Sequence, residues 1–148
     1  MAELRIVPIT GADGLVAEPD WLVRAEAVHR QLRPAMGHYA STMARVFAGG
    51  ARMVVAVADG AVRGVAVYRA FADTANGLKF YVDDLVTDEA CRGQGVGRRL
   101  MDKLSETAKA AGAGSVVLDS GTQRTRAHAF YFREGFVITS FNFKKSLS

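Results

Sequence analysis

Apolar and polar residues follow two different spacings along the chain, and each change of spacing marks a predicted element. A β-rich run over residues 4–7 predicts a first strand. Apolar residues then recur at helical spacing, which predicts helices over residues 21–32 and 38–47. Asp20 is expected to cap the first of these helices, and Pro34 is expected to end it. The first third of the chain therefore predicts one strand followed by two helices.

The spacing changes to a period of two in the middle of the chain, which is typical of strands. Residues 52–58 and 62–71 are rich in valine and alanine and flank an Asp-Gly pair at 59–60. Such a pair favours a tight hairpin, because both turn positions prefer a positive φ. An Asn-Gly pair at 76–77 repeats the signal before a third run over residues 78–87. These runs predict three consecutive strands in an antiparallel meander.

The last part of the chain returns to helical spacing directly after a glycine-rich turn at residues 92–98. A short strand is predicted over 115–119, a helix over 126–134 and a final strand over 136–143. The strand before the turn, the helix after it and the strand at 115–119 predict a right-handed parallel β-α-β unit. The fold class predicted is α+β: a three-layer domain with a mixed, mostly antiparallel central sheet flanked by helices.

The composition is that of an ordinary globular protein, because 49% of the 148 residues are hydrophobic and 23% are charged. This length predicts a single domain over residues 1–148. No apolar run approaches the ~20 residues of a membrane span, and the first ten residues show no signal peptide. Cys91 is the single cysteine, so no internal disulfide forms and a reducing compartment, the cytoplasm, is expected. The three histidines show no ligand spacing, and no metal is expected.

The glycine-rich turn is the strongest functional signal in the sequence. Gly93, Gly95 and Gly97 stand where a strand passes into a helix, and a helix N-terminus presents unpaired N–H groups to an anion. Without a Cβ, glycines let the anion approach the backbone closely. A Walker-type loop is excluded because no Lys-Ser or Lys-Thr pair follows, and a dinucleotide fingerprint needs glycine where Arg98 stands. The pattern that fits is R-x-x-G-x-G over residues 92–97.

In this pattern the sequence resembles the GNAT superfamily of acyl-CoA-dependent N-acetyltransferases. The resemblance implies a cleft between splayed strands in which the turn holds the diphosphate of acetyl-CoA. It also implies that main-chain groups of the preceding strand bind the pantetheine arm, as an added strand does at a sheet edge. The residues that this resemblance assigns to the cofactor are Leu85, Val86, Thr87, Arg92, Gly93, Gln94, Gly95, Val96, Gly97 and Arg98.

A second match lies near the C-terminus, where residues 127–136 fit the motif A-x-x-F-Y-x-x-x-G-F of the same family. The resemblance implies that Tyr131 donates a proton to the departing CoA thiolate. A phenol suits this task, because its pKa near 10 keeps it protonated at neutral pH while a thiol titrates near 8.5. The alternative for Tyr131 is a core aromatic. Arg124 stands where family members often carry asparagine, and we expect it to meet a CoA phosphate through its charge.

Two adjacent carboxylates, Asp83 and Asp84, lie in the strand before the turn. Acylation requires a free amine, so a base or a water chain must remove a proton from the ammonium form. Side chains alternate along a strand, so only one of the two carboxylates is expected to face the site unless a bulge redirects the other. We favour Asp84 and keep Asp83 open. A purely structural, ion-paired role is equally open for both.

The function expected is transfer of an acetyl group from acetyl-CoA to a primary amine by direct attack in a ternary complex. The identity of the acceptor, a small molecule or a peptide amine, is left open. The resemblance to the family also allows a homodimer. The alternative is a non-catalytic acyl-CoA-binding module on the same fold. The net charge of +4 is too diffuse to indicate nucleic-acid binding, because much of it gathers near the glycine turn, where an anionic cofactor accounts for it.

Overall fold

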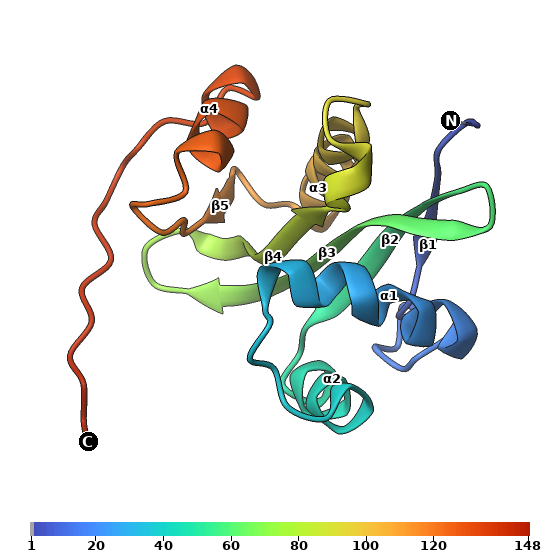
Figure 1. Cartoon of the computed structure of the whole chain (residues 1–148). Helices are drawn as coiled ribbons and strands as arrows, with labels where there is room; N and C mark the ends of the chain where they lie inside the picture. The colour runs from blue at the N-terminus through green and yellow to red at the C-terminus, as the bar shows by residue number, and fades with distance from the viewer. Residues whose placement is uncertain (1) are drawn as a thin grey trace. The chain divides into compact units, whose positions relative to one another are not determined.

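The computed structural model describes residues 2–148 (Figure 1). The chain divides into two compact units, the first ending at Val117 and the second spanning Leu118–Ser148. That the whole chain forms one domain stays a prediction.

The sheet consists of five strands in the order β1-β2-β3-β4-β5. The first four are antiparallel neighbours, and β5 runs parallel to β4. This arrangement confirms the predicted mixed, mostly antiparallel sheet with one parallel β-α-β unit. The bounds are Arg5–Pro8 for β1, Arg52–Ala58 for β2, Ala61–Asp73 for β3, Gly77–Thr87 for β4 and Val116–Leu118 for β5.

The turn between β2 and β3 forms as the sequence predicts. Asp59 has φ 53° and Gly60 has φ 72°, so both turn residues adopt the left-handed conformation. Two such residues make the tight turn whose twist matches that of the strands it joins. The hairpin prediction at 59–60 is confirmed.

Two helices lie on one face of the sheet and a third lies on the other (Figure 1). Helices α1, Pro19–Leu32, and α2, Tyr39–Ala48, precede β2, and α3, Val96–Ala111, follows the glycine turn. The predicted cap at Asp20 is wrong, because Glu18 occupies the N-cap position and α1 begins at Pro19. Proline suits a first helical position, where its φ is already helical and its missing N–H removes no hydrogen bond.

The core of the first unit fills both faces of the sheet. All but the first residue of β2 are buried, so neither face of this strand is exposed to solvent. Its alternate residues Met53, Val55 and Val57 belong to the cluster that α1 and α2 cover. On the opposite face, Gly64 of β3 lies so close to α3 that a Cβ there would stand 2.7 Å from a methyl group of Val96.

The second unit contains α4, Thr125–Arg133, which confirms the helix predicted over 126–134. The strand predicted over 136–143 is wrong, because no strand forms there in the described part of the chain. The segment has the β-branched and aromatic residues of a strand, but a strand also needs a partner whose backbone groups pair with it. Several of its apolar side chains are exposed instead: Val137, Ile138, Phe141 and Phe143.

Candidate functional site

A β-bulge in β4 lies at the acidic pair. Val67 of β3 pairs with Asp84, but the next residue, Tyr68, pairs with Val82, so Asp83 is an extra residue in β4. An extra residue reverses the alternation of side chains from that point onward. Asp83 and Asp84 therefore line the same cavity, which is the exception that the sequence analysis allowed for a bulge.

Asp84 is held by two basic side chains from α1 and the segment that follows it. One carboxylate oxygen accepts a hydrogen bond from His29 Nε2 at 2.7 Å, and the other accepts two from Arg33, at 2.6 and 2.9 Å. Burial alone would raise the pKa of Asp84, but the hydrogen bonds from His29 and Arg33 and the charge of Arg33 lower it below its ordinary value. Asp84 is therefore a carboxylate at neutral pH.

His29 connects Asp84 to a buried tyrosine. Its Nδ1 lies 3.0 Å from the hydroxyl oxygen of Tyr39, and only 1% of the histidine is exposed. When Nε2–H donates to Asp84, Nδ1 is left to accept the hydrogen bond that the Tyr39 hydroxyl donates. Burial, with the charges of Glu26 and Asp84, raises the pKa of Tyr39 well above its ordinary value, so the hydroxyl stays protonated as a donor.

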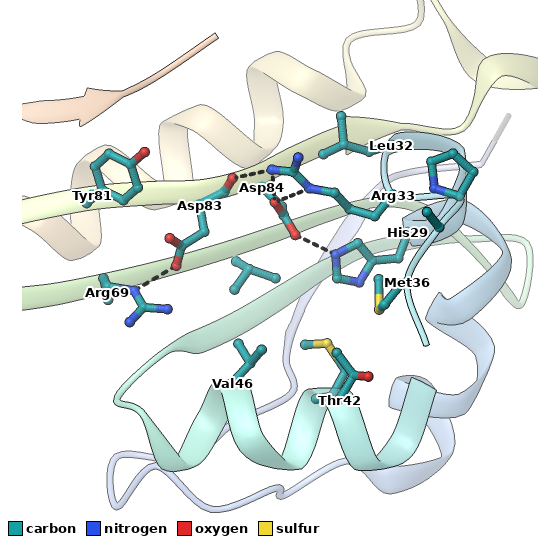
Figure 2. A pocket seen from close by; sticks show the side chains of 14 residues that line it. His29, Leu32, Arg33, Met36, Thr42, Val46, Arg69, Tyr81, Asp83 and Asp84 are labelled. Carbon is teal, nitrogen blue, oxygen red and sulfur yellow. Dashed lines mark hydrogen bonds and ion pairs between the residues drawn. The ribbon is translucent and has the colours of Figure 1, made fainter. Parts of the chain in front are cut away.

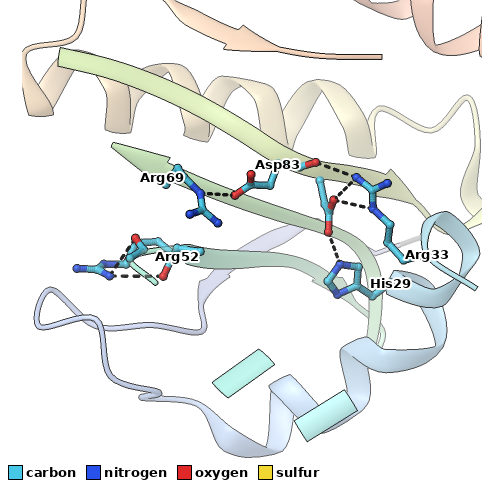
Figure 3. Close-up of polar contacts among 8 residues, drawn as sticks. His29, Arg33, Arg52, Arg69 and Asp83 are labelled. Atoms are coloured by element: carbon cyan, nitrogen blue, oxygen red, sulfur yellow. Dashed lines mark hydrogen bonds and ion pairs between the residues drawn. The ribbon is translucent and has the colours of Figure 1, made fainter. Parts of the chain in front are cut away.

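The two carboxylates line a cavity of about 600 Å³ between the sheet and the segment that contains α1 and α2 (Figure 2). This volume suits a small organic ligand. Its charged lining consists of the acidic pair and two arginines, Arg33 and Arg69, and Figure 3 shows each arginine bonded to the pair. Asp83 accepts a hydrogen bond from Arg69 Nε at 2.8 Å. The apolar lining consists of Leu32, Pro34, Ala35, Met36, Met43, Val46 and Val67.

The glycine turn has the geometry of an anion site. Gly93 and Gly95 have φ 77° and 83°, in the left-handed region, and a Cβ on either would have no neighbour within 4 Å. Within residues 2–148, no hydrogen bond is donated by the backbone N–H groups of residues 93–98, and the first bond of α3 runs from Arg99 N to Gly95 O. Six free donors beside open space fit the diphosphate of CoA.

Contacts from α1 and β3 fix the position of this turn. The side-chain amide of Gln31 donates to Asp88 at 3.1 Å, and its oxygen accepts from Glu89 N at 2.9 Å, which ties the end of β4 to α1. Asp88 N also donates to Arg63 O of β3 at 2.8 Å. These contacts hold the chain at the end of β4, and a short 3₁₀-helix, Glu89–Cys91, leads from there into the turn.

In the second unit, Tyr131 lies on α4 between two aromatic rings, Phe130 and Phe136, with ring centroids 5.6 Å away in each case. Burial raises the pKa of Tyr131 above its ordinary value, against the opposing charge of Arg124. The hydroxyl is thus protonated at neutral pH, as a proton donor requires. Arg124 is exposed at the N-cap of α4, where its side chain makes no capping hydrogen bond.

The sequence prediction missed the three basic partners of the acidic pair: His29, Arg33 and Arg69. One signal was available for His29, which follows Ala25 by four residues and so shares the apolar face of its helix. A polar side chain in that position needs a buried hydrogen-bond partner. The identity of that partner, 55 residues further along, was not available from the pattern.

The comparisons with known proteins agree with this architecture. The chain matches the model of the acetyltransferase (GNAT) family over residues 19–136, and it belongs to that family. It is 46% identical over 70 residues to the uncharacterised N-acetyltransferase YhdJ of Bacillus subtilis, a segment that covers 47% of this chain and 49% of that relative. It is 38% identical over 66 residues to the aminoalkylphosphonate N-acetyltransferase of Salmonella typhimurium, covering 45% of this chain and 43% of that relative.

The match with each of these two relatives therefore spans about half of the relative's length. Among solved structures, AAC(6′)-Iy in complex with a bisubstrate analogue, CoA-S-monomethyl-acetylneamine, superposes with a TM-score of 0.81. The two chains are 16% identical, and the match covers 99% of each. This likeness concerns the fold. No helix within residues 2–148 has the length and apolar character needed to cross a bilayer.

Proposed function

We propose that the protein is an N-acetyltransferase that moves the acetyl group of acetyl-CoA onto a primary amine within a ternary complex. The observation that carries the proposal is the row of six free amides at residues 93–98 in a chain of the GNAT family. Acetyl-CoA supplies the activated acyl thioester, and the remaining tasks fall to side chains and backbone groups of this chain.

The turn binds the cofactor in this proposal. Its amides donate hydrogen bonds to the diphosphate, and Arg92 and Arg98, both exposed, add positive charge beside it. Residues 85–87 of β4 offer main-chain groups to the pantetheine arm, and a backbone N–H near Val86 donates to the acyl oxygen. β4 leads into the turn through a short 3₁₀-helix, Glu89–Cys91, so one continuous segment sets both the diphosphate and the thioester position. Arg124 adds a charge for a CoA phosphate, as the family resemblance implies.

The acidic pair serves the amine in this proposal. Asp84 binds the amino group, with Asp83 beside it in the cavity, and Asp84 or a water bound to it accepts the proton that the amine releases. Because the pKa of Asp84 is lowered, its protonated form is short-lived, and the proton passes on to solvent. His29 and Tyr39 act as positioning residues, since they fix the carboxylate without contacting the reacting atoms.

Tyr131 completes the proton balance. A bond forms between the amine nitrogen and the acyl carbon, the carbon–sulfur bond breaks, and the phenol of Tyr131 protonates the thiolate that leaves. The phenolate then regains a proton from solvent, which received the proton released by the amine. The name of the Salmonella relative supports a small amine as acceptor, and an amine at the end of a peptide stays open. We also assign the protein to the cytoplasm, on the strength of its single buried, unpaired cysteine.

The test measures release of free thiol from acetyl-CoA with a panel of primary amines. The wild-type protein should release CoA with at least one amine. Tyr131→Phe should lower kcat by about 10²–10⁴-fold with little change in acetyl-CoA affinity. Tyr68→Phe, a matched change on the buried side of β3, is the control and should retain activity. If acetyl-CoA binds tightly and no amine releases thiol, the chain is a non-catalytic binding module.

A further inference from the structure

The cavity beside the acidic pair contains as many cations as anions, although an amine-binding pocket is expected to be negative. Asp84 is paired with Arg33, and Asp83 is paired with Arg69. His29 Nε2 also lies 2.7 Å from an oxygen of Asp84, on the basic side of the balance. A plain amine would enter the cavity as a cation and add a positive charge that no anion in these two ion pairs balances. Charges in a partly enclosed site interact far more strongly than in water, so the imbalance is costly.

Arg69 has hydrogen-bond donors to spare in this cavity. Only its Nε bonds Asp83, and no hydrogen bond among residues 2–148 involves its two terminal nitrogens. The side chain is 33% exposed and lines the cavity, and Figure 2 shows Arg69 and Arg33 on either side of the acidic pair. Two parallel N–H groups of one guanidinium match the two oxygens of a carboxylate or a phosphonate.

The strand register places the two binding groups on one face of the sheet. Val67 lies opposite Asp84, and Arg69 is two residues further along β3, so the side chains of Asp84 and Arg69 both line the cavity. Arg69 is bonded to Asp83, the neighbour of Asp84, so a ligand that carries a nitrogen and an acid group on a short carbon chain can contact both side chains. The apolar lining beyond them suits a hydrocarbon side chain.

We infer that the acceptor is a small zwitterionic amine: an amino group, an anionic carboxylate or phosphonate on the same short carbon chain, and an apolar side chain. Asp84 receives the amino group, the terminal nitrogens of Arg69 receive the acid, and Met36, Met43 and Val46 receive the side chain. The inference rests on the proposed function and names the substrate class of the same site.

The test compares matched ligands on the wild-type protein. Alanine, valine, leucine and methionine are each assayed against their amides and their decarboxylated amines, and the phosphonate analogue of leucine separates the two sources of the acid. For at least one of the four, kcat/KM for the acid-bearing member should exceed that of its partners by about tenfold or more. Equal or faster reaction of the amides and plain amines overturns the inference and leaves the proposed function intact.

A variant ties the preference to Arg69. Arg69→Met should reduce the advantage of the acid-bearing ligands to within about threefold, whereas Arg69→Lys should retain part of it. Arg45→Met, an exposed change on α2, is the matched control and should leave the ratio unchanged. An unchanged ratio in Arg69→Met contradicts the assignment of this residue.

Binding separates the two proposals if no ligand is acetylated. In calorimetric titrations of the protein saturated with CoA, a preference for acid-bearing ligands supports the inference while the proposed function fails. Binding of none of the panel, or equal binding of acids and amides, overturns the inference by itself.

Discussion

Gly64 of β3 lies against the first turn of α3, so an added methyl group there tests how closely the sheet and this helix pack. A Cβ at Gly64 would stand 2.7 Å from Val96 Cγ1, 2.8 Å from Leu100 Cδ1 and 3.2 Å from the carbonyl oxygen of Val86. Both helical side chains are fully buried, and the valine has a single favoured rotamer in a helix. The clash is therefore relieved by moving the first turn of α3 and not by rotating a side chain.

The magnitude follows from the overlap. Carbon atoms pack at about 3.5–4.0 Å, so the first turn of α3 must retreat by about 0.7–1.3 Å in Gly64→Ala. Overpacking of this kind costs about 1–3 kcal/mol, which lowers Tm by roughly 3–10 °C in a chain of this length. The same displacement moves the amides at residues 93–98 away from the diphosphate, and we expect the Kd for CoA to rise about tenfold.

Thermal unfolding and a CoA titration on the same samples measure both effects. Gly114→Ala is the matched control, because a Cβ there meets no atom within 4 Å and the backbone is not left-handed. The double variant Gly64→Ala with Val96→Ala should regain part of the CoA affinity, since it removes the nearer methyl group. If Gly64→Ala is as stable as Gly114→Ala and binds CoA equally well, the packing argument is wrong.

Three further variants test the turn and the acidic pair. Gly95→Ala should cost about 1–2 kcal/mol through its left-handed φ alone, because its Cβ meets open space, and should weaken CoA binding in a titration. Asp84→Asn should lose about 2 kcal/mol at pH 7 in urea unfolding. The folded pKa of Asp84 lies below the unfolded value of about 3.9, so this stabilisation is complete above pH ~3.9. It disappears as pH falls through the folded pKa, and there the stabilities of wild type and variant should converge. His29→Phe leaves Tyr39 without a partner and Asp84 with Arg33 alone, and it should lower kcat. The effect of adding Tyr39→Phe should be much smaller than in wild type.

Most of the fold follows from local patterns. The run over 52–58 is β2 as the structure has it, and the glycine turn and the helix after it lie where the sequence predicts. These elements are set by side-chain period, turn residues and caps, which are properties of neighbouring residues. The segment at 136–143 shows the limit of such reasoning, because its strand-like composition supplies no partner strand.

The site was less predictable because its geometry depends on register and on distant residues. A side-chain period assigns Asp83 and Asp84 to opposite faces, and only the pairing of β4 with β3 reveals the bulge that brings them together. Likewise, the partners of the pair come from α1 and β3, and no motif links those segments to β4. The lining of the cavity is therefore visible only in the structure, whereas the glycines of the turn predict its position from the sequence.

The amides of the turn are the groups that bind CoA in the proposed function. A ¹H–¹⁵N correlation spectrum recorded during a CoA titration observes each of them. We predict that the signals of residues 93–98 shift most strongly and saturate together, as new hydrogen bonds to the diphosphate form. If CoA binds while these six signals stay in place and the largest shifts fall elsewhere, the turn does not hold the cofactor and the proposed enzyme assignment fails.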